Sequence, residues 1–333
     1  MTAQRPPRQA RPGPAGPGPA VVAFGGGHGL SASLSALRLM SERLTAVVTV
    51  ADDGGSSGRL RHEMGVLPPG DLRMALSALC DESDWGRLWR DVMQHRFHTD
   101  GEMNDHAVGN LLIAALWELL GDPVSGLDWV GRLLGARGRV LPVASVPLEI
   151  EADVLAPGAP QPHVVRGQSS VAGAAGDVCR IRLAPADPAV PDEVLGAVAE
   201  ADWVVLGPGS WFTSVLPHLA IPRIAEAVRA SHARRCLTLN LFPASGRVGG
   251  MTCHQHLAAV AAHAPGLTFD VVVADPSAVD DLDLMHEQVE ALGAQLLLRQ
   301  VRVGDGTARH DALRLAAAYR DAFEGTLGDV GHR

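Results

Sequence analysis

Short apolar runs alternate with amphipathic segments along most of the chain, beginning at Val21. The run VVAFGG predicts a first buried strand, a helix over about residues 30–40 follows, and TAVVTV predicts a second strand over residues 45–50. Apolar strands that alternate with helices are typical of parallel sheets, because helices cover both faces of such a sheet. We therefore expect an α/β fold with a parallel sheet at its centre.

Two segments depart from this alternation. Residues 71–135 are mainly helical in pattern, and we expect a lid-like helical segment whose first helix is capped by Asp71 of the sequence PPGD. Residues 139–184 contain the strand-like runs LEIEADVL, HVVRGQSSV and CRIRL, separated by Gly, Pro and Ala. The sequence therefore predicts a small β-rich insert over residues 139–184.

The alternation resumes after this insert. Helices are predicted near residues 191–200, 223–230 and 311–323, and strands for WVVLGPGS, CLTLNL, FDVVVAD and QLLLRQV. Residues 21–330 are therefore expected to form a single domain. Residues 1–20 are rich in Pro, Gly and Arg and lack the apolar stretch of a secretory signal, so a disordered tail is expected there.

Composition narrows the class of partner. The 333-residue chain is 47% hydrophobic, which is enough for a large core, and its formal net charge is −9. This charge disfavours broad contact with nucleic acid or anionic lipid, and no apolar run reaches the roughly 18–20 residues that a membrane span needs. The four cysteines are far apart, so neither a zinc knuckle nor a disulfide framework is indicated. We expect a soluble protein of the reducing cytoplasm.

A glycine-rich loop separates the first predicted strand from the helix that follows. It consists of Gly25, Gly26, Gly27, His28 and Gly29. Glycines let backbone N–H groups approach a phosphate closely, and a helix N-terminus adds about half a positive charge. The loop is not a G-x-G-x-x-G fingerprint, because Leu30 takes the place of the last glycine, and it lacks the Walker lysine. We predict a phosphate cradle; the alternative is a tight turn that binds nothing.

A second loop carries two acidic residues after the next strand. Asp52 and Asp53 open the sequence DDGGSSGR, and ligands of open parallel sheets bind beyond such strand ends. The carboxylates are suited to a magnesium ion that bridges a diphosphate, or to the hydroxyls of a ribose. We assign the metal to Asp52 and Asp53 and a nucleotide contact to Asp53. A turn-capping role is the alternative, and for Asp52 it has at least equal weight.

A third loop repeats the arrangement of strand, glycine turn and helix start. Its predicted ligand contacts are Gly207, Pro208, Gly209, Ser210, Thr213 and Ser214. Two anion cradles at one sheet edge suggest two phosphates of one ligand. A plain turn is again the alternative, since Gly and Pro occur in turns of every kind.

A Gly-Asn pair interrupts the apolar helix pattern HAVGNLLIAALWELL. Glycine costs about 1 kcal/mol relative to alanine in a helix, so the pair is expected to have a purpose. The amide of Asn110 both donates and accepts, which suits a uracil edge or a sugar hydroxyl. Equally, Gly109 permits close helix packing. No zinc-binding spacing and no nucleophile elbow occurs, so neither a zinc enzyme nor nucleophilic catalysis is predicted.

These motifs, in this order, resemble a known family. VVAFGGGHGL, VTVADDGGSSGRLR, PPGDLRMALSAL, HAVGNLL, GRVLPV and VVLGPGSWFTSVLPHL are similar to the CofD-like superfamily, specifically its bacterial gluconeogenesis-factor (YvcK-like) branch, over roughly residues 21–275. The chain departs from the family in two places: His28 replaces a common threonine, and residues 241–248 read LFPASGRV where a Pro-Gly-Glu-Thr stretch is usual. Backbone contacts to phosphate would survive both changes.

The resemblance implies a Rossmann-like sheet and the binding of UDP-sugars such as UDP-N-acetylglucosamine. It also implies a regulatory role in cell shape, cell-wall precursor supply and central carbon metabolism, which requires a regulatory protein partner and leaves self-association open. The other branch of the superfamily implies an alternative, a magnesium-dependent 2-phospho-L-lactate transferase that acts on a nucleotide diphosphate donor. A dinucleotide-dependent oxidoreductase ranks third, because the third glycine of its fingerprint is absent.

Overall fold

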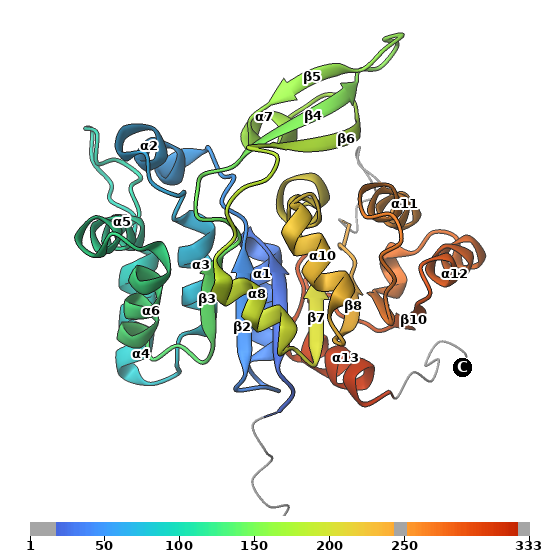
Figure 1. The fold of residues 1–333 in the computed structure, drawn as a ribbon. Coiled ribbons are helices and arrows are strands. Elements are labelled where there is room, and N and C mark those ends of the chain that lie inside the picture. The colour runs from blue at the N-terminus through green and yellow to red at the C-terminus, as the bar shows by residue number, and fades with distance from the viewer. Residues whose placement is uncertain (1–17, 243–251, 326–333) are drawn as a thin grey trace, which may run out of the picture.

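A seven-stranded parallel sheet forms the centre of the protein in the computed structural model, which describes residues 18–242 and 252–325 (Figure 1). The strand order is β10-β9-β8-β7-β1-β2-β3. Its strands are β1 (Val21–Gly25), β2 (Leu44–Val48), β3 (Arg139–Pro142), β7 (Trp203–Leu206), β8 (Arg234–Thr238), β9 (Val271–Ala274) and β10 (Gln295–Leu298). The predicted Rossmann-like α/β class is thereby confirmed.

Helices connect these strands and pack beside them. They are α1 (Gly27–Leu37), α2 (Gly55–Met64), α3 (Gly70–Leu79), α4 (Asp84–Gln94), α5 (Val108–Leu120), α6 (Pro123–Leu134), α8 (Asp192–Ala199), α9 (Leu216–Leu219), α10 (Pro222–Ala230), α11 (Cys253–His263), α12 (Leu282–Ala291) and α13 (Ala312–Glu324). A π-helical turn, η1 (Trp211–Val215), precedes α9, and a 3-10 turn, η2 (Pro276–Ala278), follows β9. No helix of the described ranges is long and apolar enough to cross a bilayer.

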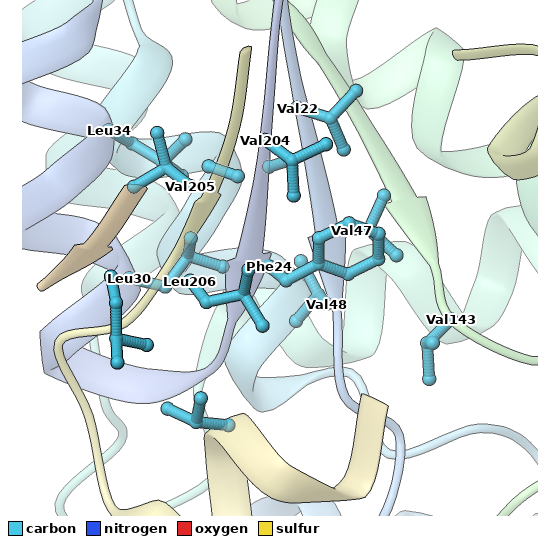
Figure 2. Packing of buried hydrophobic residues seen from close by; sticks show 14 of the residues in the cluster. Val22, Phe24, Leu30, Leu34, Val47, Val48, Val143, Val204, Val205 and Leu206 are labelled. Atoms are coloured by element: carbon cyan, nitrogen blue, oxygen red, sulfur yellow. The ribbon is translucent and has the colours of Figure 1, made fainter. Parts of the chain in front are cut away.

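The core lies between the central strands and the helices beside them. Every residue of β1 and β7 is buried, as expected for strands that are covered on both faces. Figure 2 shows two leucines of α1 against β7, with Leu30 near Leu206 and Leu34 near Val205. These leucines lie four positions apart and so share one face of the helix, and both are at most 1% exposed. This packing fixes the start of α1 relative to the ends of β1 and β7.

A small antiparallel sheet, order β5-β4-β6, projects beyond the carboxyl edge of the main sheet (Figure 1). It contains β4 (Glu149–Leu155), β5 (His163–Arg166), β6 (Asp177–Ala184) and the short helix α7 (Gln168–Ala172). The predicted insert began at residue 139, but β3 pairs in parallel with β2 and so belongs to the main sheet. A four-residue strand with the sequence RVLP fits either sheet, so its pattern could not decide between them.

The helical segment does not form a lid over the sheet edge. Helices α4, α5 and α6 lie beside β3, and the insert occupies the space above the strand ends instead (Figure 1). The predicted cap is also corrected: Pro69 is the N-cap of α3, and Asp71 is the second residue of that helix. Three predicted segments lie wholly or partly outside the described residues: residues 1–17 of the predicted tail, residues 243–248 of the altered loop, and residues 326–330 at the end of the predicted domain.

Candidate functional site at the strand ends

Strand β1 lies at the point where the strand order of the sheet changes direction. Strand β1 pairs with β2 on one side and with β7 on the other, and the later strands extend the sheet outward from each. A topological switch point therefore lies between β1 and β7. In open α/β sheets the crevice at the carboxyl ends beside such a point is the usual ligand site. The first and third glycine loops both start there.

The first and third loops are in direct contact. A Cβ atom on Gly29 would lie 2.2 Å from the carbonyl oxygen of Pro208 and 2.7 Å from the Cα of Gly209. A Cβ atom on Gly209 would in turn lie 3.9 Å from the carbonyl oxygen of Gly26. Only glycine at position 29 allows this approach, so one ligand could touch both loops.

The first loop presents amide groups at the start of α1. Gly26 is the N-cap in an extended conformation, and the helix begins at Gly27. The backbone of Gly27 lies beside the carboxyl group of Asp71. The next two amides, of His28 and Gly29, belong to the first turn and have no acceptor inside the helix. The side chain of His28 is exposed, so two amides and an imidazole lie at this helix start.

The third loop uses most of its own amides internally, contrary to the simple cradle that the sequence predicts. Gly207 N–H donates to Phe24 O at 3.3 Å, and Pro208 has no N–H. Gly209 N–H donates to Asn240 Oδ1, and Asn240 Nδ2 donates to Gly209 O, both at 2.8 Å. Of the four loop residues, Ser210 alone retains an amide for a ligand. Asn240, at the end of the neighbouring strand, therefore positions this loop.

A buried hydroxyl network supports the third loop from behind. Ser33 Oγ donates to Gly207 O at 3.0 Å and lies 2.7 Å from the Tyr319 hydroxyl oxygen. Tyr319 Oη also lies 3.0 Å from Thr238 Oγ1, and all three side chains are fully buried. Burial raises the pKa of Tyr319 well above its usual range, and the nearby Cys236 thiol adds to the rise. The loop therefore rests on a rigid, neutral polar cluster.

The two aspartates of the second loop have different partners. Asp52 Oδ1 accepts from Gly54 N–H at 3.1 Å, which is the turn-capping role. Asp53 is exposed, and its Oδ1 accepts from Ser169 N–H of α7 at 2.9 Å. Asp53 thus joins the second loop to the insert, while its ligand role stays a prediction.

Asp71 is the site residue whose role the sequence reasoning missed. Its carboxyl lies beside the first loop, because a Cβ atom on Gly26 would be 2.5 Å from Asp71 Oδ2. Burial raises the pKa of Asp71 to about 7, and the negative charge of Asp52 contributes to the rise. The PPGD sequence placed Asp71 at a helix start, but its proximity to Asp52 and Gly27 is visible only in three dimensions.

The described residues contain no group of three or more His, Cys, Asp or Glu side chains that could hold a metal ion. Asp52 and Asp71 nevertheless supply two neighbouring carboxyl groups at the crevice. Magnesium at phosphate sites is commonly held by one or two carboxylates together with phosphate oxygens. Asp52 and Asp71 therefore fit magnesium when a diphosphate supplies the remaining ligands, and the assignment of the metal to Asp52 and Asp53 stays a prediction.

The Gly-Asn pair lies in a buried network at the start of α5. Asn110 is 1% exposed; its Oδ1 accepts from Arg73 Nε at 2.9 Å, and its Nδ2 donates to Ser56 Oγ at 3.0 Å. A Cβ atom on Gly109 would lie 2.7 Å from Met93 O. The contacts support the packing alternative for Gly109. Asn110 orients the start of α2 through Ser56, and its ligand contact remains a prediction.

Thr213 and Ser214 lie in the π-helical turn after the third loop. Thr213 is 3% exposed, whereas Ser214 is half-buried and donates its N–H to Ser210 O at 2.8 Å. Of the predicted hydroxyls, those of Ser210 and Ser214 are therefore the more accessible. The structure brings the first and third loops together and places Asp52 beside Asp71 near the first loop. Asn110 instead lies in the buried network with Arg73 and Ser56.

An open α/β sheet with glycine loops abutting at its switch point defines a class of phosphate- and nucleotide-binding proteins. Residues 21–301 match the family described as 2-phospho-L-lactate transferase CofD. The chain belongs to this CofD family.

Curated relatives narrow the branch. A protein of Mycobacterium tuberculosis is 49% identical over 303 residues, covering 89% of this chain and 88% of its own. Proteins named gluconeogenesis factor from Halalkalibacterium halodurans and Bacillus subtilis are 36% and 32% identical, covering 93% and 92% of this chain and 98% of each relative. The crystal structure of a UPF0052 family member from Bacillus halodurans has a TM-score of 0.80 at 33% identity, covering 90% of this chain and 98% of that one. The chain is thus similar to gluconeogenesis factors over nearly its whole length.

Proposed function

We propose that this protein binds a UDP-sugar, such as UDP-N-acetylglucosamine, at the switch point and acts as a regulatory protein. The pyrophosphate would lie between the first-turn amides of α1 and the amide of Ser210. The observation that carries this proposal is the contact of Gly29 with Pro208, which brings both loops within reach of one diphosphate. Helix starts and backbone amides favour anions without requiring a reactive side chain.

The regulatory role follows from the resemblance to gluconeogenesis factors. Relatives that carry this name cover almost the entire chain. Cytoplasmic control of cell shape, cell-wall precursor supply and central carbon metabolism is the role that we propose, through a protein partner that reads the occupied state. The insert is suited to such a readout, because Asp53 joins it to the second loop.

Titration calorimetry with UDP-N-acetylglucosamine, GDP and NAD tests the ligand class. We expect the UDP-sugar to bind most tightly, and magnesium to strengthen binding because it neutralises Asp52 and Asp71 beside the phosphates. Tightest binding of NAD would instead favour a dinucleotide enzyme. The absence of binding by all three would refute the proposal.

A second candidate function is a transferase of the CofD type, and the Asp52–Asp71 pair favours it. Magnesium would neutralise the charge of the diphosphate when bound there. An acceptor hydroxyl would form a new P–O bond as the nucleoside monophosphate leaves, and its proton would pass to solvent while Asp52 and Asp71 hold the magnesium ion. The test is whether the protein releases a nucleoside monophosphate from a phospholactyl donor. Release by the wild type that is lost in Asp71→Asn would establish a transferase rather than a protein that only binds the nucleotide.

A further inference from the structure

A groove separates the insert from the helices of the main domain, on a face that none of the glycine loops reaches. Strand β6 forms one wall, and α9, α10 and the end of α11 form the other. Its volume is about 1040 Å³. Small-molecule pockets typically measure about 300–1,000 Å³, so the groove is large enough for a segment of polypeptide.

The strand wall of the groove is an unpaired sheet edge. Strand β6 pairs with β4 on one side, and no main-chain hydrogen bond joins it to α9, α10 or α11 within the described ranges. Ile181 N–H points away from β4, and Leu183, two residues along, directs its backbone groups the same way because these groups alternate along a strand. Unpaired edges of this kind accept an additional strand from a partner.

A histidine occupies one of these edge positions. Ile181 N–H donates to His263 Nε2 at 3.1 Å, while His263 Nδ1 lies 2.8 Å from Ala259 O. A carbonyl only accepts, so Nδ1 carries the hydrogen and Nε2 offers its lone pair. The imidazole thus takes the position that a backbone carbonyl of an added strand would take.

The helix wall leaves room for that strand. Its residues at the groove include Ala220, Pro222, Ala225 and Ala262, all with short side chains. Short side chains let a peptide backbone lie close to the helices while it pairs with β6. The groove therefore offers a hydrogen-bonding edge opposite a smooth wall.

Charge selects the chemistry of the partner. Arg180 and Arg229 line the groove, are exposed, and form no ion pair with any described residue. Arg182 is already paired with Asp153, which leaves Glu226 as the single unpaired carboxylate of the described groove lining. Two free guanidinium groups against one carboxylate give the groove a local positive charge, which favours an acidic segment.

We propose that this groove binds an extended, acidic segment of a partner protein, which displaces His263 from Ile181 and adds as a strand to the outer edge of β6. The backbone of the segment would pair with Ile181 and Leu183, and its carboxylates would meet Arg180 and Arg229. The site is separate from the nucleotide loops, so it does not depend on the function proposed above.

A display library of random twelve-residue peptides, panned on the full chain, tests this proposal. Selected peptides, labelled with a fluorophore, are then titrated by anisotropy against the wild type and four variants. Ala262→Trp fills the groove from an exposed position, and Ala261→Trp is its matched control on the exposed surface outside the groove. Arg180→Glu combined with Arg229→Glu reverses the charge, with Arg223→Glu on the same helix α10 as control.

We expect the selected peptides to be rich in Asp and Glu. Their affinity should fall at least tenfold with Ala262→Trp and with the double charge reversal, and should stay within twofold of the wild type with both controls. Thermal melts confirm that each variant is folded. A library that yields no binders, binders without acidic bias, or binders equally tight on Ala262→Trp would overturn the proposal.

Discussion

Replacement of Gly29 by alanine tests the contact between the first and third loops. Gly29 lies in the first turn of α1, and its backbone does not need the left-handed region, so alanine is conformationally acceptable. The added Cβ atom would, however, lie 2.2–2.7 Å from three backbone atoms of Pro208 and Gly209. Backbone cannot rotate away as a side chain can, so the loops must separate.

The magnitude follows from two opposing terms. Alanine gains up to about 1 kcal/mol over glycine in a helix, whereas overpacking of a tight contact costs about 1–3 kcal/mol. We expect Gly29→Ala to lower the free energy of unfolding by about 1–2 kcal/mol. UDP-sugar affinity should fall at least tenfold, which corresponds to about 1.4 kcal/mol, because the two loops no longer reach one diphosphate.

Gly196→Ala is the matched control. Gly196 lies in helix α8, and a Cβ atom there would meet no atom within 4 Å. This variant should gain about 0.5–1 kcal/mol in stability and bind ligand as the wild type does. Urea unfolding and calorimetry measure both quantities. If Gly29→Ala matched Gly196→Ala in stability and in affinity, the reasoning about abutting loops would be refuted.

Three further predictions concern single polar groups. Asn240→Ala removes both bonds to Gly209 and should weaken UDP-sugar binding about tenfold by calorimetry, with a loss of about 1–3 kcal/mol in urea unfolding; unchanged affinity would remove its positioning role. Tyr319 is the single tyrosine of the chain, and burial raises its pKa. Absorbance near 295 nm should therefore show no tyrosinate in the folded protein at pH 11, and the free energy of unfolding should fall as the pH rises above about 10. Ionisation of the folded protein near pH 10 would contradict this. Asp71→Asn should raise the free energy of unfolding relative to the wild type, by a margin that grows from pH 4 to about pH 7 and then levels off. The reason is that the raised pKa of Asp71 penalises folding of the wild type over that range. A margin independent of pH would contradict this.

Much of the fold could be predicted because strands and helices differ in period. The buried runs of β1 and β9 and the pattern of α13 place these elements within one or two residues of their observed bounds, whereas the strand predicted over WVVLGPGS ends four residues earlier, at Leu206. Helices α11 and α12 were not predicted. The alanine- and histidine-rich sequence of α11 has no clear apolar stripe, so periodicity alone could not identify it.

The site was predictable only where local sequence determines it. Glycine loops at strand ends are local signals, and so their positions were found. The roles of Asp71, Asn240 and Tyr319 depend on contacts between residues distant in the chain: Asn240 reaches Gly209 across 31 positions, and Tyr319 reaches Ser33 across 286. No single-sequence pattern reports such pairings. They explain why Gly209, although correctly located, offers no free amide to a ligand.

A crystal structure of the protein with UDP and magnesium tests the central claim most directly. The account predicts the pyrophosphate at the switch point, with one phosphate at the amides of His28 and Gly29 and the other at the amide of Ser210. A nucleotide bound elsewhere, or with its phosphates in contact with neither α1 nor the third loop, would contradict it.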